Sequence, residues 1–240
     1  MANLSEAVEE YLEKLYWFGE AGIEPTQANL ARALGVSQPS VLEMVRRLVE
    51  DGLVERDARK RLHFTERGDA VAEHIVSRHR KIEAFLVQVM GIPWDEVHEE
   101  AHTFEHAISD NLERRMDELL KDTTQCPHGH PIGDAPREPG DPLTSAPVGS
   151  RVRVLRHENE DPDLLRAYKL AGVEPGDTIG VTALHGDLIE LDTPARGRQR
   201  LALTAAQAVS VAIEQRGDGA IADVSDLDWA ALLSATAWGR

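Results

Sequence analysis

Hydrophobic residues in the first third of the chain recur every three or four positions, a spacing typical of amphipathic helices. The first run predicts a helix over residues 4–18, and a shorter run predicts a second helix from Thr26 to Gly35. A third helix is expected from Ser37, whose side chain can cap the first turn, to Gly52. Its apolar face is predicted to be Val41, Leu42, Val45 and Leu48. Two short helices joined by a tight turn indicate a helix-turn-helix.

The next segment changes to short strand-like runs at 53–56 and 62–64, separated by a polar, basic hairpin tip at 57–61. This pattern adds a wing to the helix-turn-helix. Helical spacing then returns and predicts one long helix capped by Thr65 and a second helix over about 94–120. Two long helices with little between them favour a dimerisation unit.

Six prolines interleaved with glycines mark residues 123–147 as an extended linker. Short β-like runs follow, with one helical patch, and they predict a small barrel. The expected fold class is therefore mainly α with a β barrel. The predicted domains are a winged helix at 1–66, a helical domain at 67–122, the linker, a barrel at 148–215, and an extension of unassigned role at 216–240.

Composition narrows the class of protein. The chain has 240 residues and 42% hydrophobic residues, but no apolar run near the roughly 18 residues that span a bilayer. A transmembrane protein is excluded, and the acidic start does not resemble a secretory signal. One cysteine cannot form an internal disulfide, which fits a cytoplasmic protein.

The formal net charge of −16 is unevenly distributed. Residues 26–67 hold eight basic and six acidic side chains, a net of +2, whereas residues 95–120 hold nine carboxylates and two arginines, a net of −7. A module that binds a polyanion beside a module that binds cations would give this separation, and so would two solvated helix faces.

Histidines and glutamates at helical spacing form the strongest chemical signal. Residues at i and i+3 or i+4 share one helix face, so such pairs can present two ligands to one cation. The candidates are Glu10 and Glu13 on the first helix, His79 and Glu83 on the fourth, and His98, His102, Glu105 and His106 on the fifth. Any single pair is usually a solvated face, but three helices that each carry such a set predict metal binding.

Two other motifs suggest different chemistry. Residues 98–102 read HEEAH, which matches the HExxH pattern of metalloproteases, so a metal-dependent hydrolase is the alternative function. A protease needs a substrate cleft, whereas this chain devotes its first sixty residues to a winged helix. The group Cys126, His128 and His130 lies in a segment rich in proline and glycine, where a turn is preferred to a zinc ligand set.

The order of these motifs resembles the diphtheria-toxin-repressor family of iron- and manganese-dependent transcriptional regulators. The motifs that carry it are the winged helix, His79-Arg80-x-x-Glu83, the residues from Val97 to Ser109, and Cys126-Pro-His-Gly. The match is dense over 4–133 and looser over 148–214, where it implies an SH3-like (FeoA-like) barrel. The resemblance also implies a homodimer that binds palindromic operator DNA when loaded with divalent metal and controls metal-uptake genes. We therefore expect a regulator and not an enzyme, with no membrane partner and no small organic substrate.

The resemblance implies two neighbouring metal sites, with Glu105 and His106 in the primary site and His79, Glu83 and His98 in the other. Iron-type members carry cysteine at the position of His102 and methionine at that of Glu10, whereas manganese-type members carry acidic residues at Glu10 and Glu13. Manganese-type members normally have glutamate at His102, so the match is incomplete. We therefore expect Mn2+, with Fe2+ as the alternative and Co2+, Ni2+, Zn2+ or Cd2+ as substitutes in vitro.

The barrel of iron-type members supplies a glutamate and a glutamine to the second site. Arg156 and Asn159 stand nearest these positions here, so Asn159 and Glu160 are the possible barrel ligands. Hydroxyls and amides at the start of the third helix can bond bases or phosphates, Pro39 can touch a thymine methyl, and basic side chains can neutralise phosphates. The residues expected at DNA are Thr26, Ser37, Gln38, Pro39, Ser40, Glu43, Arg46, Arg47, Arg59, Lys60 and Arg61.

A metal could control DNA binding because the first helix leads directly into the helix-turn-helix. Without metal, Glu10, Glu13 and Glu105 are expected to repel one another and to leave that helix loosely held. A divalent cation would reverse the repulsion. Fixing the helix would set the spacing of two recognition helices in a dimer.

Overall fold

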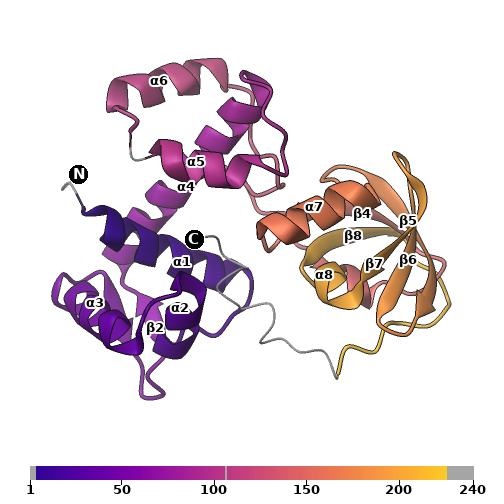
Figure 1. Ribbon diagram of the computed structural model, residues 1–240, viewed down its shortest axis with the longest axis horizontal. Helices are drawn as coiled ribbons and strands as arrows, with labels where there is room; N and C mark the ends of the chain where they lie inside the picture. Colours follow the sequence, from indigo (N-terminus) through magenta and orange to yellow (C-terminus); the bar gives the residue numbers. More distant parts are fainter. Residues whose placement is uncertain (1–3, 106, 226–240) are drawn as a thin grey trace.

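The computed structural model describes residues 4–105 and 107–225, which form a winged helix, a helical region and a sheet domain (Figure 1). The winged helix contains α1 (Glu6–Glu20), α2 (Gln27–Leu34), α3 (Gln38–Glu50), β1 (Val54–Arg56) and β2 (Leu62–Phe64). Strands β1 and β2 pair antiparallel, which gives the predicted wing. Helix α1 extends to Glu20, beyond the predicted end.

Local capping explains the short helices of the winged helix. The Thr26 side chain accepts a hydrogen bond from the Asn29 backbone at the start of α2, and the Ser37 side chain does the same for Ser40 in α3. Gly35 ends α2 with a positive φ of 63°, which favours glycine. The prediction for Leu42 is wrong, because its residue is 51% exposed while the core face of α3 consists of Val41, Val45 and Leu48.

The helical region contains α4 (Glu66–Gln88), α5 (Val97–Glu105) and α6 (Asp110–Leu119). Thr65 caps α4 as predicted. The single helix expected over 94–120 is wrong, because Ser109 accepts a hydrogen bond from the Leu112 backbone and starts a new helix, α6. The start of α4 packs closely on the wing: a Cβ on Gly68 would lie 1.7 Å from the carbonyl oxygen of Leu53, so only glycine fits.

The sheet domain is one antiparallel sheet of six strands in the order β3-β8-β4-β5-β6-β7. Its elements are β3 (Asp141–Pro142), the 3-10 helix η1 (Leu143–Ser145), β4 (Arg151–His157), α7 (Pro162–Ala171), β5 (Thr178–His185), β6 (Leu188–Thr193), β7 (Gly197–Ala202), α8 (Leu203–Gln207) and β8 (Val209–Gln215). No pairing within the described chain joins β3 to β7, so the expected barrel is an open sheet. Leu143 and Ala146 lie in its core, so the end of the predicted linker belongs to this domain.

Aromatic stacking joins the sheet domain to the helical region. His157 of β4 stacks between Trp94, which precedes α5, and Tyr168 of α7, with ring centroids 5.4 Å and 4.4 Å away. Lys169 of α7 adds an ion pair to Asp95 at 2.5 Å. These contacts hold the end of β4 against the helices, and the loop after β4 carries the glutamates discussed below (Figure 1).

The predicted helix-like pattern at 216–240 is not seen over 216–225, which form no helix or strand, and its remainder lies outside the described residues. None of the described helices is long and apolar enough to cross a membrane.

Candidate metal centre

Two clusters of metal-ligand side chains lie where α1, α4 and α5 meet. We call the first the sheet-side cluster, which consists of His79, Glu83, His98, Cys126, His128 and Glu160. We call the second the α1 cluster, which consists of Glu13, His102 and Glu105. Within each of the two overlapping groups that form the sheet-side cluster, and within the α1 cluster, ligand atoms lie within 4.8 Å of one another.

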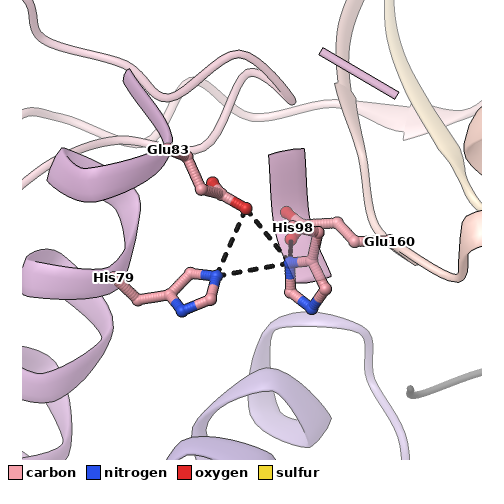
Figure 2. A group of neighbouring side chains, drawn as sticks. All are labelled: His79, Glu83, His98 and Glu160. Atoms are coloured by element: carbon pink, nitrogen blue, oxygen red, sulfur yellow. Dashed lines mark hydrogen bonds and ion pairs between the residues drawn. The ribbon is translucent and has the colours of Figure 1, made fainter. Parts of the chain in front are cut away.

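Glu83 is the centre of the sheet-side cluster (Figure 2). Its Oε1 lies 3.3 Å from His79 Nε2, 3.0 Å from His98 Nδ1 and 3.3 Å from His128 Nδ1. The cluster draws on α4, α5, the turn at 126–130 and the loop after β4. Glu160, from that loop, places Oε2 2.8 Å from His98 Nδ1 and Oε1 3.5 Å from His128 Nδ1. Its side chains therefore join the helical region to the sheet domain.

The α1 cluster joins the first helix to α5. His102 Nδ1 lies 3.1 Å from Glu105 Oε1. Glu13, on α1, is 1% exposed and belongs to the same group. His79 stands between the two clusters, because its Nδ1 lies 2.9 Å from Glu105 and 3.4 Å from Glu13 while its Nε2 faces Glu83. The two clusters are therefore in direct contact.

Charge pairing overcomes burial for most of these groups. Burial disfavours the ionised form of Glu83, but the positive charge of His128, and then the hydrogen bond from His79, hold its pKa well below the ordinary value. Burial likewise opposes ionisation of Glu105, yet hydrogen bonds from His102 and His79 lower its pKa to about 2. The pKa of His79 is raised well above 6.5, against burial, by Glu13 and Glu105. The protonated imidazole of His79 therefore balances the carboxylates around it.

Some ligand atoms remain without a hydrogen-bond partner in the described chain. Burial raises the pKa of Glu13 against the lowering effect of His79, and repulsion from Glu105 adds to the rise. Three buried atoms in the two clusters have no hydrogen-bond partner, namely Glu13 Oε1, Glu83 Oε2 and His128 Nδ1. An unsatisfied buried polar atom costs free energy, whereas metal ions bound in the two clusters would satisfy these atoms. Carboxylates and imidazoles in this arrangement fit a divalent cation.

The structure brings most, but not all, of the predicted ligands together. His79, Glu83, His98, His102, Glu105 and Glu13 lie in the clusters, and so does Glu160. Glu10 is half-buried and belongs to neither cluster. Asn159 also stays outside, because its Oδ1 accepts a hydrogen bond from the backbone N–H of Asp161 at 3.0 Å. His106 lies outside the described residues.

The HEEAH motif does not form a protease site. A zinc protease needs both histidines of HExxH on one ion, but His98 belongs to the sheet-side cluster and His102 to the α1 cluster. Glu99, which would be the general base, is exposed.

Sequence reasoning missed Cys126 and His128 as cluster members. The preference for a turn was correct in part, because the Gly129 N–H donates to the Cys126 carbonyl at 3.0 Å. The same turn nevertheless directs both side chains into the sheet-side cluster, so treating it as a turn alone was wrong. Burial, and then Glu83, raise the pKa of the Cys126 thiol to about 11. The sequence signal that could have revealed this was the motif Cys-x-His-x-His, which places the only cysteine of the chain and two of its ten histidines within five residues.

The predicted DNA-binding residues lie on the winged helix, and several are engaged within the protein. Thr26 and Ser37 cap helices, and the Ser37 and Ser40 hydroxyls lie 2.8 Å apart. Arg61 pairs with Asp57 at 2.6 Å, so it fixes the wing turn. The remaining predicted residues, all exposed, are Gln38, Pro39, Glu43, Arg46, Arg47, Arg59 and Lys60.

Comparison with known proteins agrees with a metal site beside a DNA-binding winged helix. Residues 3–62 match the family model described as iron dependent repressor, N-terminal DNA binding domain, and residues 65–134 match its metal binding and dimerisation domain. The chain is 35% identical over 227 residues to the iron-dependent repressor IdeR of Mycobacterium tuberculosis, covering 88% of this chain and 99% of the relative. It is 32% identical over 203 residues to the diphtheria toxin repressor of Corynebacterium efficiens, covering 79% and 88%.

A solved structure of a manganese-dependent transcriptional repressor in complex with manganese superposes with a TM-score of 0.78 at 32% identity, over 86% of this chain and 99% of that one. These proteins and the matched models are repressors, and none supports the hydrolase alternative. The chain therefore belongs to the iron-dependent repressor family and is a metal-dependent transcriptional repressor, not an enzyme.

Proposed function

We propose that this chain is a cytoplasmic, homodimeric repressor that binds palindromic operators of metal-uptake genes when it holds Mn2+. The observation that carries the proposal is the α1 cluster, where Glu13 of α1 meets His102 and Glu105 of α5. Helix α1 packs in the core of the winged helix through Val8 and Leu12. The position of α1 therefore links the metal ligands to the DNA-binding surface.

Within this proposal, Glu13, His102 and Glu105 hold one cation and the sheet-side cluster holds another. A bound divalent cation supplies positive charge that offsets the repulsion between the Glu13 and Glu105 carboxylates. The ligand residues position the helix: α4 and α5 pack against each other, and Glu13 attaches α1 to the ligands of α5. Helix α1 contacts α2, and α2 contacts α3, so the position of α1 is passed on to the recognition helix through α2.

The choice of Mn2+ over Fe2+ rests on the α1 cluster, whose described ligands are oxygen and imidazole without sulfur. Such donors suit Mn2+, whereas sulfur favours softer metals. Cys126 brings sulfur only to the sheet-side cluster. The repressor with manganese found among the similar structures supports the same choice. Fe2+ remains the alternative.

Dimerisation is proposed through the helical region, in line with the dimerisation domain matched at 65–134. Helices α4 and α6 are in contact, and large apolar side chains are exposed at their ends, namely Val89, Met90, Leu112 and Leu119. Exposed apolar groups of this kind are typical of subunit interfaces. Replacing Leu119, which is 62% exposed, with glutamate should shift the protein towards monomer in analytical ultracentrifugation.

The test of the proposal is DNA binding at controlled free metal concentration. The protein is mixed with fluorescent duplexes selected from a random pool, anaerobically, with Mn2+, with Fe2+ or with chelator. DNA binding that requires metal supports the proposal, provided that Mn2+ activates binding at a lower free concentration than Fe2+ does. The variant His102→Cys, which brings sulfur into the α1 cluster, should lower the response to Mn2+ and raise the response to Fe2+. An unchanged ranking of the two metals would remove the support for manganese.

A further inference from the structure

Leu42 is a large apolar side chain of α3 that is exposed to solvent. The residue is 51% exposed, whereas Val41, Val45 and Leu48 of the same helix are completely buried. A leucine left in water loses the free energy that burial would provide. Its place on the recognition helix of a repressor suggests that DNA covers it.

The neighbours of Leu42 form a continuous exposed face. Pro39 precedes it by three residues and Arg46 follows by four, so the three side chains lie on one side of the helix. Glu43 is adjacent and also exposed. This face is apolar near the N-terminus of α3, which is the end of a recognition helix that contacts bases. Figure 1 shows α3 at the outer side of the winged helix, remote from the sheet domain.

Other polar groups on α3 have partners within the protein. Ser37 caps the helix and lies 2.8 Å from the Ser40 hydroxyl. Arg46 pairs with Glu50 at 2.8 Å, and Arg47 lies 3.8 Å from Asp51. Within the part of the chain that the structure describes, Gln38 and Glu43 make no such contact.

Charge indicates what Glu43 can contact in DNA. A carboxylate is repelled by phosphates, so its favourable partner in a duplex is an exocyclic amine, and cytosine N4 offers one in the major groove. Arg46 and Arg47 on the same helix are paired with acidic residues, but Arg59 and Lys60 of the wing are exposed, and residues 26–67 as a whole carry a net charge of +2, the sign that a polyanion requires. An apolar protein partner would not explain this charged border.

We propose that Leu42 packs against the C5 methyl group of a thymine in the operator and that Glu43 accepts a hydrogen bond from the N4 amine of a nearby cytosine. The two residues are then specificity determinants of this repressor. The inference rests on the proposed metal-dependent DNA binding and extends it by naming the bases that are recognised.

The experiment compares thymine with uracil, which differs only by that methyl group. Duplexes are selected from a random pool by the full-length protein with Mn2+, and each conserved thymine in them is replaced by uracil in turn. Loss of one buried methyl should weaken wild-type binding about fourfold at one position in each half-site. The variant Leu42→Ala should bind the thymine and uracil duplexes equally.

Two further variants complete the test. Val49→Ala is the matched control, because Val49 lies seven residues further along α3 and is 40% exposed; this variant should keep the wild-type preference for thymine over uracil. Glu43→Gln should shift the preferred base from cytosine to adenine in a repeated selection, since glutamine pairs with adenine.

The outcomes separate this inference from the proposed function. If Leu42→Ala keeps the wild-type ratio of thymine to uracil binding, the inference is overturned while metal-dependent DNA binding stands. If the wild-type protein with metal binds no duplex, the proposed function fails and the inference fails with it. Equal salt dependence for Leu42→Ala and wild type should show that the variant is folded and keeps its phosphate contacts.

Discussion

Glu83→Gln is the substitution that should most reduce stabilisation by metal at the sheet-side cluster. Glu83 is completely buried and its Oε1 faces three histidines, His79, His98 and His128. Glutamine has nearly the same volume, so packing is preserved while the charged ligand is lost. Glu105→Gln is the matched change in the α1 cluster. Glu118→Gln, on the exposed surface of α6, serves as the control.

The magnitude follows from binding linkage. A ligand that binds only the folded state at one hundred times its Kd adds about 2.7 kcal/mol to the free energy of unfolding. For a chain of this length, 1 kcal/mol changes the melting temperature by roughly 2–4 °C. Each occupied cluster should therefore raise the melting temperature by about 5–10 °C. Glu83→Gln and Glu105→Gln should each lose about half of the wild-type increase, and the double variant should lose nearly all of it.

The assay is thermal unfolding at buffered free Mn2+, compared with the same protein in chelator. Glu118→Gln should keep the full increase. If Glu83→Gln and Glu105→Gln both keep it as well, the two clusters are not the metal sites and the reasoning is refuted. If each single variant loses the whole increase, the clusters bind metal as one unit, through the contact of His79 with both.

Three other substitutions test the structure more widely. Asp57→Ala removes the carboxylate that holds the wing turn, so binding to all duplexes should weaken without a change of sequence preference, as measured by fluorescence anisotropy. Arg137→Ala removes ion pairs to Glu20 at 2.9 Å and Glu158 at 2.6 Å, and should lower the urea-unfolding free energy by about 1–3 kcal/mol. Burial lowers the pKa of His157 to about 3 in the folded protein. Below about pH 6.5 the His157 side chain is therefore protonated in the unfolded state but stays neutral in the folded state, which favours unfolding. In chelator, stability should fall by up to about 1.4 kcal/mol per pH unit below that value, and by less in His157→Gln.

The winged helix was predictable because its signals are local. The caps made by Thr26, Ser37 and Thr65 act over three residues, and Gly35 has the positive φ expected after a helix. Such interactions depend on neighbours in the sequence and little on the rest of the fold. The burial of Leu42 was predicted wrongly for the opposite reason. Helical spacing identifies an apolar face but does not say whether protein or DNA covers it.

The error over residues 94–120 shows the limit of periodicity. Apolar residues keep helical spacing across the break, so Ile108 and Leu112 suggest one continuous helix. The hydrogen bond from the Leu112 N–H to the Ser109 side chain starts a second helix instead. The wing strands and most of the sheet were predicted from short β-like runs. Strand β7 was not, because its first four residues are glycine, arginine, glutamine and arginine, and only Leu201 and Ala202 are apolar.

The residue types of the candidate metal centre were predictable, but not which residues belong to which of its two clusters. Spacing on α5 places His98 and His102 on one face, yet they join different clusters, because the helix passes between α1 on one side and the loop after β4 on the other. Glu160 and His128 reach Glu83 where the sheet domain packs on the helical region. One of the contacts that hold this junction is the stacking of Trp94 on His157, residues 63 positions apart. Helical spacing cannot report such a contact. The sheet domain therefore decides which ligands meet, and a variant that loosens this stacking should weaken the sheet-side cluster before the α1 cluster.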